Sequence, residues 1–397
     1  MSSPPLLTVV IPTHNRALYA KSAIQSILSI KSELLQLVVH DTSESNDLEQ
    51  FAAGLVDDHR FKYIHCPQRL TMTENHNAAM HAAEGRYVCL IGDDDTIMPE
   101  AMEAVAWASK KNIDALTPTV VANYAWPDFK SRVFGMSHAG RIYIKKKFGG
   151  IVQRSTKESL KRSLNNAAQG TDGLPKIYHG FVRRSAMEEI RARSGAFFHG
   201  SSPDVSGAIG LALSLSSFVE IDYPLTLPGA SGKSNTGRSA VNTHKGALAK
   251  DAQTAKFASS GWPDEIPRFF SVETVWAHAA IETARRLDAS VLHDFNFIRL
   301  YGICWLRHKE FRQNTLEAFN NCQWSKWQHV ERAKVALFRT ILCLATATIV
   351  RLAERATVPT AAGRRNYIPR INTIADAQSA LASYLDRTHT RLSSLLK

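Results

Sequence analysis

The chain has 397 residues, 44% of them hydrophobic, so it can build a sizeable core and is long enough for roughly two or three domains. Its formal net charge of +12 suits an anionic partner, such as a nucleotide substrate, an anionic membrane surface or nucleic acid. No basic-aromatic motif or zinc pattern accompanies this charge, which argues against a nucleic-acid-binding protein.

Cysteine usage and the N-terminus bear on where the protein works. The five cysteines are scattered and none forms a Cys-x-x-Cys pair, which predicts reduced thiols in an intracellular protein. The N-terminus lacks a basic region followed by an apolar one, so we expect no secretory signal. The longest apolar run, 340–350, is too short for a spanning helix. We therefore expect a cytoplasmic protein, or one that is peripheral on the inner face of the cell membrane.

Strands and helices alternate through the first hundred residues. Asn15 is the predicted N-cap of the first helix, Thr71 and Glu74 fit a capping box, and Gly85 fits the stop of the helix that this box opens. The alternation predicts a parallel, doubly wound α/β sheet. Apolar runs predict its strands at 6–11, 35–39, 61–65 and 87–91.

The rest of the chain is less regular and then becomes helical. Residues 124–141 are expected to form a hairpin or flap, and 229–243, rich in Gly, Ser and Asn, to be mobile. Further strands are predicted at 115–121, 177–182 and 218–221, and helices at 157–164, 185–193 and 201–215. Beyond about residue 247, helices are predicted at 273–287, 295–310, 314–321 and 326–356.

Three consecutive carboxylates, Asp93, Asp94 and Asp95, follow the strand at 87–91 and Gly92. Adjacent carboxylates repel one another unless a cation or a donor-rich ligand lies among them. At the carboxyl end of a buried parallel strand they lie where open α/β sheets bind ligands. Their oxygens suit Mg²⁺ or Mn²⁺, with substrate phosphates completing the shell. A solvated acidic turn is the alternative, and the flanking strand and helix favour the ligand site.

Three stretches, in this order and at the usual spacing, resemble the family 2 glycosyltransferases, which have the GT-A fold. The resemblance covers about residues 6–230 and does not reach the helical tail. The stretches are Thr8-Val-Val-Ile-Pro-Thr-His-Asn-Arg16, then Val38-Val-His-Asp41, then Asn77 with Ala83-Glu-Gly85 and Tyr87 leading into Asp93–Asp95 and Pro99.

The resemblance implies a division of the chain into two parts. Residues 1–245 would be a Rossmann-like GT-A catalytic domain, with a mostly parallel sheet flanked by helices. Its nucleotide-sugar half would span about 1–120 and its acceptor half about 121–245. Residues 246–397 would be a helical C-terminal extension that serves packing, oligomerisation or membrane association.

The resemblance also implies an inverting, metal-dependent transfer from a nucleotide-diphosphate sugar, such as a UDP-sugar, to a hydroxyl of a glycan or lipid-linked acceptor. Bacterial surface-polysaccharide synthesis is the commonest setting of the family. Asp94 and Asp95 would hold Mn²⁺ or Mg²⁺, with His244 as a third ligand. The family often has acidic residues where this chain has His40 and Gly92, so which two aspartates touch metal stays open. Nucleotide contacts are expected from Pro12, Thr13, Asn15, Arg16, Asp41, Asn77 and Asp93.

Asp204 fits the position of the catalytic base in inverting members, because Ser202-Pro203-Asp204 opens a predicted helix. Helix capping is the alternative for Asp204, while Glu188 and Glu189 are alternative bases on a charged helix face. Gly229-Ala-Ser-Gly-Lys-Ser234 hints at a P-loop, but Leu227 stands where the first glycine is needed. We interpret it as a loop that closes over donor phosphates, with Lys233 as a contact.

Two other classes of protein stay open. A non-catalytic nucleotide-sugar-binding or scaffolding protein would keep the fold but would not need a base at Asp204. A nucleotidyltransferase is disfavoured, because no Gly-rich signature with Arg or Lys lies near the N-terminus. The helix around 340–350, flanked by Arg332, Arg339 and Arg351, would lie in a membrane interface, or pack on the catalytic domain or a second subunit.

Overall fold

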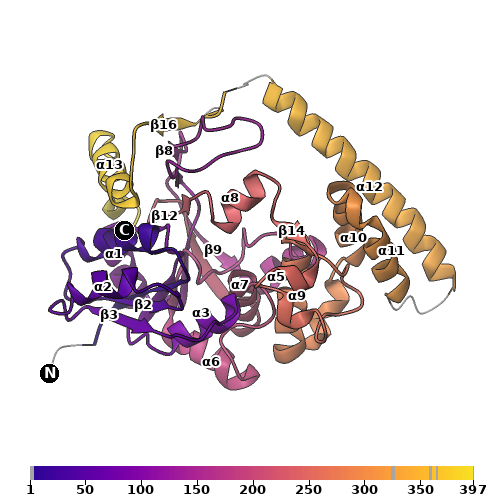
Figure 1. The fold of residues 1–397 in the computed structure, drawn as a ribbon, viewed down its shortest axis with the longest axis horizontal. Coiled ribbons are helices and arrows are strands. Elements are labelled where there is room, and N and C mark those ends of the chain that lie inside the picture. Colours follow the sequence, from indigo (N-terminus) through magenta and orange to yellow (C-terminus); the bar gives the residue numbers. More distant parts are fainter. Residues whose placement is uncertain (1–3, 323–326, 357–359, 364, 397) are drawn as a thin grey trace.

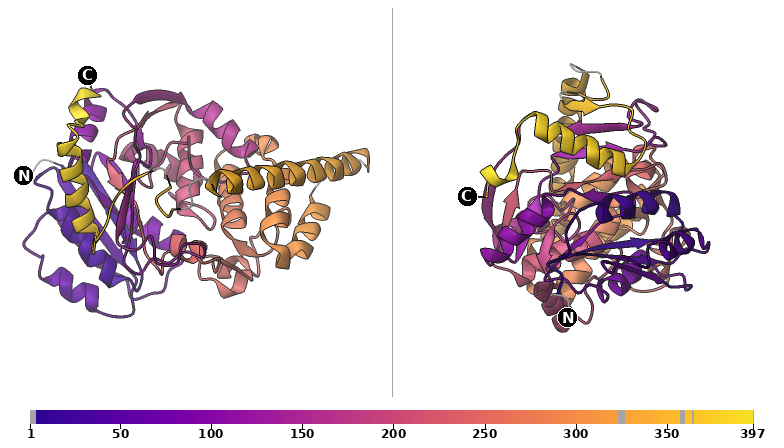
Figure 2. Two further views of the ribbon diagram at one scale, coloured as in Figure 1. Left: turned by 90° about the horizontal axis from the view of Figure 1, so that it is seen from above. Right: turned by 90° about the vertical axis from the view of Figure 1, so that its left-hand side faces the viewer.

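The computed structural model of the chain describes residues 4–322, 327–356, 360–363 and 365–396. Figure 1 shows an α/β part, formed mainly by the N-terminal half, beside a cluster of helices from the C-terminal half. A long helix, α12, runs along the outer edge of that cluster in both Figure 1 and Figure 2.

The central sheet has eight strands in the order β3-β2-β1-β4-β10-β6-β11-β9. Its first four strands, β1 Leu7–Thr13, β2 Leu35–Asp41, β3 Phe61–His65 and β4 Tyr87–Leu90, are parallel. β6 Ala115–Pro118 and β11 Ser217–Ile221 run parallel to each other, whereas β10 Phe181–Arg183 and β9 Ile151–Ser155 are antiparallel to their neighbours. The predicted mostly parallel α/β sheet is confirmed.

Helices cover both faces of this sheet, so its central strands β1, β2 and β4 are buried along their whole length and are rich in apolar residues. Successive side chains point to opposite faces. Val9 and Ile11 pack in one core with α1 and α4, whereas Val10 and Val88 pack in another with α3, α6 and α7. The α-helices before residue 215 are α1 Ala17–Leu28, α2 Asp47–Ala53, α3 Met72–Met80, α4 Ala101–Lys110, α5 Thr156–Asn165, α6 Arg184–Ser194 and α7 Pro203–Ser214.

A second, smaller sheet stands beside the first. The predicted hairpin is confirmed: β7 Ala122–Ala125 pairs antiparallel with β8 Arg141–Ile144 around a long loop. β13 Gly229–Ala230 adds to β7, and β16 Asn366–Ile368 adds to β8. Further short elements are β5 Thr96–Ile97, β12 Thr226–Leu227, α8 Asn235–Ala240, β14 Lys245–Gly246 and β15 Phe270–Ser271.

The C-terminal region consists mainly of helices, as predicted. α9 Val272–Leu287, α10 Phe297–Arg307, α11 Arg312–Asn321 and α12 Trp327–Ala356 form the helical cluster. The chain then returns to the α/β part, where α13 Ile374–Arg387 packs on α1 in the same apolar core. Sequence analysis did not identify β16 or α13. The boundary at residue 245 stays a proposal.

Three local predictions are wrong. α1 is capped by Arg16, since Asn15 is left-handed (φ 55°) and its side chain accepts a hydrogen bond from the Glu44 N–H. α3 ends at Met80, and Gly85 instead allows close packing on β1: a Cβ there would lie 2.5 Å from the Thr8 nitrogen. Most of 177–182 is a turn, in which Tyr178 forms only an isolated bridge with Leu90, and the strand β10 begins at Phe181.

The length estimate for the apolar stretch at 340–350 also needs correction. Within α12, Val330–Val350 is long and apolar enough to cross a membrane by length and composition, although only 6% of it is buried. The estimate failed because it stopped at Arg339, and apolar residues continue on the amino side of that arginine.

Candidate active site

Motif residues that are far apart in the sequence meet at the carboxyl ends of three neighbouring strands. β1 lies between β2 and β4, so the chain order reverses here, as at the ligand-binding crevice of open α/β sheets. Thr13, at the end of β1, lies opposite Asp41 of β2 in register. Its hydroxyl donates to Asp93 Oδ2, which follows β4, at 2.7 Å.

Arg16 connects the first motif to the aspartates. Its Nε lies 2.6 Å from Asp93 Oδ1, and its Nη2 lies 3.0 Å from Asp94 Oδ2. Burial alone would lower the pKa of this guanidinium, but Asp93 and Asp94 raise it above its ordinary value. Its Nη1 is buried and has no hydrogen-bond partner among the described residues. Arg16 therefore neutralises part of the acidic cluster and keeps one donor free.

Asp94 carries the least compensated charge of the three aspartates. Its Oδ2 accepts hydrogen bonds from the Ser231 hydroxyl at 2.6 Å and the Ser231 N–H at 3.2 Å. Burial and the neighbouring Asp95 nevertheless raise the pKa of Asp94 to about 7, despite the opposing effect of Arg16. An additional cation beside this carboxylate would therefore be stabilising.

Asp95 is held by donors on both of its oxygens. Oδ2 receives the Gly92 N–H at 2.8 Å and the Tyr178 hydroxyl at 3.0 Å, and it lies 3.0 Å from His179 Nε2. Oδ1 receives the Gly229 N–H at 2.6 Å. Burial raises the pKa of Asp95, but His179 and the two N–H groups outweigh that effect and hold the pKa below its ordinary value.

The two side chains on Asp95, Tyr178 and His179, are site residues that sequence analysis missed. They lie in the turn before β10, where His179 has a φ of 58°, a conformation that costs a non-glycine residue about 1–3 kcal/mol. A Cβ on Gly92 would lie 2.9 Å from both the Tyr178 hydroxyl and Asp95 Oδ2, which explains why glycine stands there. The local pattern resembled a strand and gave no signal for this turn.

The Gly-rich segment at 229–234 lies over the aspartates. Besides Gly229 and Ser231, Gly232 contributes an N–H that donates to Asp128 Oδ2 at 3.0 Å. The Trp126 indole donates to the Asp94 carbonyl at 3.0 Å from the long β7–β8 loop. The segment expected to be mobile is thus hydrogen-bonded to the acidic cluster. Lys233 is exposed, and its contact with phosphates stays a prediction.

The predicted base and ribose contacts lie on two loops that are tied together. The Asn15 N–H donates to the Ser43 hydroxyl at 2.7 Å, and Pro12 lies opposite His40 in the β1–β2 register. Asp41 is fully buried and accepts from the Ser43 N–H at 2.8 Å, from the Ser43 hydroxyl and from the Tyr63 hydroxyl at 2.9 Å. Its contact with a base stays a prediction.

Asn77 is occupied by protein contacts. Its side-chain oxygen accepts the N–H groups of Phe197 and Phe198, and its amide donates to the carbonyls of Thr73 and Phe198. These bonds fasten α3 to the segment that leads into α7. A nucleotide contact by Asn77 stays a prediction, and its observed contacts position the segment before Asp204.

Asp204 lies in the first turn of α7 and accepts a hydrogen bond from the Ser202 hydroxyl. Burial, Asp95 and Asp94 raise the pKa of Tyr178, and Asp204 adds to that effect. Its carboxylate is therefore close enough to interact with a residue that touches Asp95. By contrast, the alternative base Glu188 is paired with Arg191 at 2.8 Å on the charged face of α6.

His244 lies in different surroundings. Its Nδ1 is 3.1 Å from the Ser239 hydroxyl, and its ring centroid is 4.7 Å from that of Phe270. Burial, followed by the charge of Arg238, lowers its pKa to about 4, so the ring is neutral. In the described ranges, no group of three or more His, Cys, Asp or Glu side chains is placed to hold an ion. Its role as a metal ligand stays a prediction.

The two aspartates alone fit a cation that is shared with a substrate. Mg²⁺ is commonly held by one or two carboxylates together with substrate phosphates, and oxygen donors also suit Mn²⁺. Because burial and the neighbouring Asp95 raise the pKa of Asp94, a cation beside this carboxylate would favour its charged form. Asp94 and Asp95 therefore suit a cation that arrives with a diphosphate.

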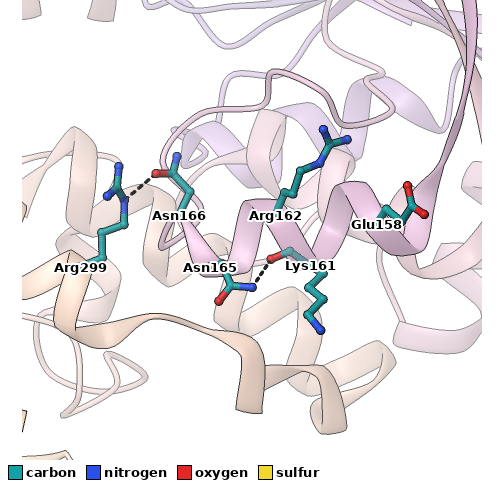
Figure 3. A pocket seen from close by; sticks show the side chains of 6 residues that line it. All are labelled: Glu158, Lys161, Arg162, Asn165, Asn166 and Arg299. Atoms are coloured by element: carbon teal, nitrogen blue, oxygen red, sulfur yellow. Dashed lines mark hydrogen bonds between the residues drawn. The ribbon is translucent and has the colours of Figure 1, made fainter. Parts of the chain in front are cut away.

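A cavity of about 590 Å³ lies elsewhere, between α5 and α10. Figure 3 shows Arg299 of α10 directed at Asn166, with Nε 2.6 Å from Oδ1. No predicted site residue lines this cavity. Its lining residues are Glu158, Lys161, Arg162, Asn165, Asn166 and Arg299.

Residues 8–190 match the family model described as Glycosyl transferase family 2. A relative from Campylobacter jejuni, named GalNAc(5)-diNAcBac-PP-undecaprenol beta-1,3-glucosyltransferase, is 30% identical over 103 residues, which cover 25% of this chain and 33% of the relative. Glycosyltransferase GlyG from Streptococcus pneumoniae is 24% identical over 121 residues, covering 30% and 39%. The chain thus spans about a third of the length of these curated relatives.

Two solved structures are also similar. Staphylococcus aureus TarS 1–349 with UDP-GlcNAc has a TM-score of 0.46 at 14% identity, covering 84% of this chain and 81% of that one. The mannosyltransferase PcManGT from Pyrobaculum calidifontis, with GDP-Man and Mn²⁺, has a TM-score of 0.40 at 12% identity, covering 98% and 89%.

Proposed function

Because residues 8–190 match the model of glycosyl transferase family 2, we propose that the chain transfers a sugar from a nucleotide-diphosphate donor to an acceptor hydroxyl. One observation carries the proposal. The first and third motif stretches supply Thr13, Arg16 and the aspartates to a single cluster at the carboxyl ends of β1 and β4. An anionic, phosphate-containing ligand with a bound cation matches the charges of that cluster.

Donor binding is assigned to the loops after β1 and β2. Pro12, Thr13 and Asn15 line the crevice edge, Asp41 accepts from the nucleobase, and Asp93 faces the ribose. The base is proposed to be uracil, and Asp41, with three donors already on its two oxygens, retains capacity for one further hydrogen bond. Asn77 holds the segment before α7 in place through its hydrogen bonds to Phe197 and Phe198. It would contact the nucleotide directly only if the donor displaced these hydrogen bonds.

The proposed reaction inverts the sugar carbon. Asp204 accepts the proton of the acceptor hydroxyl, whose oxygen forms a bond to the anomeric carbon. The bond from that carbon to the diphosphate oxygen breaks, and its electron pair leaves with the nucleoside diphosphate. Attack from the face opposite the leaving group gives inversion. A general base in this role contributes about 10²–10⁴-fold in rate.

Mn²⁺ or Mg²⁺, held by Asp94 and Asp95, would neutralise the charge that develops on the leaving diphosphate. Arg16 keeps Asp93 and Asp94 in place, and His179 and Tyr178 keep Asp95 in place. Gly229 and Ser231 contact the same carboxylates, so donor entry requires this segment to give up at least part of its hydrogen bonding. His244 would join as a ligand only after such a rearrangement.

The acceptor is proposed to be a glycan, free or lipid-linked, in bacterial surface-polysaccharide synthesis. The Campylobacter jejuni relative is named for a PP-undecaprenol acceptor, which supports the lipid-linked form. An enzyme that uses such an acceptor would work at the cytoplasmic face of the membrane. Residues 1–245 would carry out both donor and acceptor binding, and 246–397 would serve assembly or membrane contact.

Thermal shift and turnover together test the proposal. A panel of UDP- and GDP-sugars is added to the full chain with Mn²⁺ or with EDTA, because a bound donor raises the unfolding temperature by mass action. We expect stabilisation by one donor class only with Mn²⁺, and slow release of its nucleoside diphosphate. Metal-independent stabilisation without turnover on any donor would instead indicate a non-catalytic nucleotide-sugar-binding protein.

A further inference from the structure

The long helix α12 has two apolar faces, and only one of them is covered. Ala333 and Leu337 pack with Tyr301 and Phe319 in an apolar cluster. Further along, a Cβ on Gly302 of α10 would lie 3.0 Å from Thr340 and 3.4 Å from Leu344, so the two helices approach closely there. At 3.6 residues per turn, these four α12 residues share one side of the helix.

The opposite side exposes large apolar side chains. Val335 is 52% exposed, Phe338 63%, Leu342 51%, Ile349 66% and Leu352 65%. Their spacings of three, four or seven residues place them on one stripe, about half a turn from the side on α10. Exposed apolar groups in a row of this kind mark an interaction surface. We call Val335, Phe338, Leu342, Ile349 and Leu352 the free stripe.

Basic residues border the free stripe. Lys334 and Arg339 are exposed and lie roughly 70° to either side of it on the helical wheel. Lys334 also contacts Glu331 at 2.8 Å, an exposed pair of little energetic weight. The sequence from 340 to 350 has no charged residue, and Arg351 follows it. An apolar stripe between cations complements a membrane interface with anionic head groups.

We propose that the free stripe of α12 docks on an anionic lipid bilayer, with the helix lying in the plane of the interface. The helix has 30 residues and is therefore about 45 Å long, which gives it ample contact length. The packing of α12 on α10 argues against a spanning orientation, because a helix that crossed the bilayer would lose the contacts of Thr340 and Leu344 with Gly302. Lys334 and Arg339 would extend their charged ends to the head groups.

A second copy of the chain is the rival occupant, because the stripe also has the spacing of a coiled-coil seam. Charge argues against it. In a parallel pair, Lys334 and Arg339 occupy the flanking positions that face each other across the seam, so each contact would join two like charges. Anionic lipid instead pairs favourably with both residues and with the net charge of +12.

Vesicle co-sedimentation of the full chain, without any donor, tests docking independently of sugar transfer. The probes are vesicles of phosphatidylcholine alone and of equal parts phosphatidylcholine and phosphatidylglycerol. We expect sedimentation with the anionic vesicles only, and release near 1 M salt, where the screening length falls to about 3 Å. Absence of sedimentation with anionic vesicles, or equal sedimentation with both, would overturn the proposal.

Two variant pairs locate the surface. Phe338→Ser with Leu342→Ser should lower vesicle partitioning more than ~10-fold, whereas Val56→Ser with Val152→Ser, which are also exposed, should leave it unchanged. Lys334→Gln with Arg339→Gln should lower it by about 25-fold, and the matched charge change Lys146→Gln with Lys147→Gln should not. If either α12 variant and its control lowered vesicle partitioning equally, α12 would not be the docking surface.

Oligomeric state separates the two occupants. Light scattering should give a monomer for the wild-type chain and for the Phe338→Ser, Leu342→Ser variant. A wild-type dimer that this variant converts to monomers would assign the stripe to a second copy and contradict lipid docking. Unchanged thermal unfolding of the variant, expected because both side chains are exposed, shows that any loss of vesicle binding is not a loss of fold.

Discussion

Arg16 Nε lies 2.6 Å from Asp93 Oδ1, across 77 positions of the sequence. Both side chains are largely buried, and the same guanidinium also contacts Asp94. Removing one partner of a buried ion pair leaves an uncompensated charge, which typically costs about 3–5 kcal/mol. Arg16 is therefore a structural counter-ion of the acidic cluster before any donor or metal binds.

Arg16→Gln should accordingly lower the free energy of unfolding by about 3 kcal/mol at pH 8. The loss should shrink as the pH falls below 7, because Asp94 then becomes protonated and no longer needs the counter-charge. Urea denaturation at several pH values measures this. Arg154→Gln, which breaks the more exposed 2.6 Å pair with Glu220, is the control and should cost less than about 1 kcal/mol. Equal, pH-independent losses would refute the counter-ion role.

Asp94 and Asp95 should respond oppositely to amide substitution, although we expect either change nearly to abolish transfer. The pKa of Asp94 is raised to about 7, so its ionisation destabilises the folded chain as the pH rises through that value. Asp94→Asn should therefore raise the unfolding temperature at pH 8 and have little effect near pH 4. The measurement is thermal unfolding across that range, without added metal.

Asp95→Asn should instead destabilise the chain. The pKa of Asp95 is held below its ordinary value, so its contribution to stability is present at neutral pH and is lost as the pH falls through the folded pKa. An amide cannot accept equally well from His179, Tyr178 and the two N–H groups. If Asp95→Asn raised the unfolding temperature as Asp94→Asn does, the distinction between the two carboxylates would be wrong.

The sequence was sufficient to predict the four parallel strands β1 to β4 and the main acidic cluster. β1 to β4 are rich in apolar residues, and turn residues and capping signals separate them, so local patterns locate them. The capping box of Thr71 and Glu74 is present in the structure for the same reason. Asp93 to Asp95 were identifiable because three adjacent carboxylates at the end of such a strand repel one another unless a cation or a donor-rich ligand lies among them.

The partners of these aspartates could not be predicted, because they come from distant and irregular segments. Ser231 and Gly229 lie more than 130 positions away from the carboxylates that they contact. His179 reaches Asp95 through a left-handed turn that resembles a strand in sequence. α13 lacked a motif that would tie it to α1, and its place depends on tertiary packing of Leu381 and Leu385.

Cation binding should depend on the nucleotide. In the described part of the chain, Asp94 and Asp95 belong to no group of three or more His, Cys, Asp or Glu side chains that is placed to hold an ion, so they form an incomplete ligand set. Mn²⁺ titration followed by electron paramagnetic resonance should show weak binding to the chain alone and tight binding with UDP. UDP with the Asp94→Asn variant is the control for metal bound by nucleotide alone. Stoichiometric tight binding without nucleotide would contradict the shared-ligand arrangement.

Asp204→Asn should separate donor binding from turnover. Asp204 opens α7, its charge adds to the raised pKa of Tyr178, and it has no ion pair among the described residues. If it accepts the proton of the acceptor hydroxyl, the amide should lower turnover by at least ~10²-fold. The donor-induced thermal shift should stay near the wild-type value, because the base faces the acceptor.

Glu188→Gln is the matched control for Asp204→Asn, since it makes the same chemical change in the alternative base. Glu188 pairs with Arg191 on an exposed helix face, so its loss should leave turnover within about twofold and stability within about 0.5 kcal/mol. If turnover fell strongly in Glu188→Gln and stayed normal in Asp204→Asn, Glu188 and not Asp204 would be the catalytic base. A collapse of donor affinity in Asp204→Asn, with turnover of bound donor intact, would make Asp204 part of the donor site.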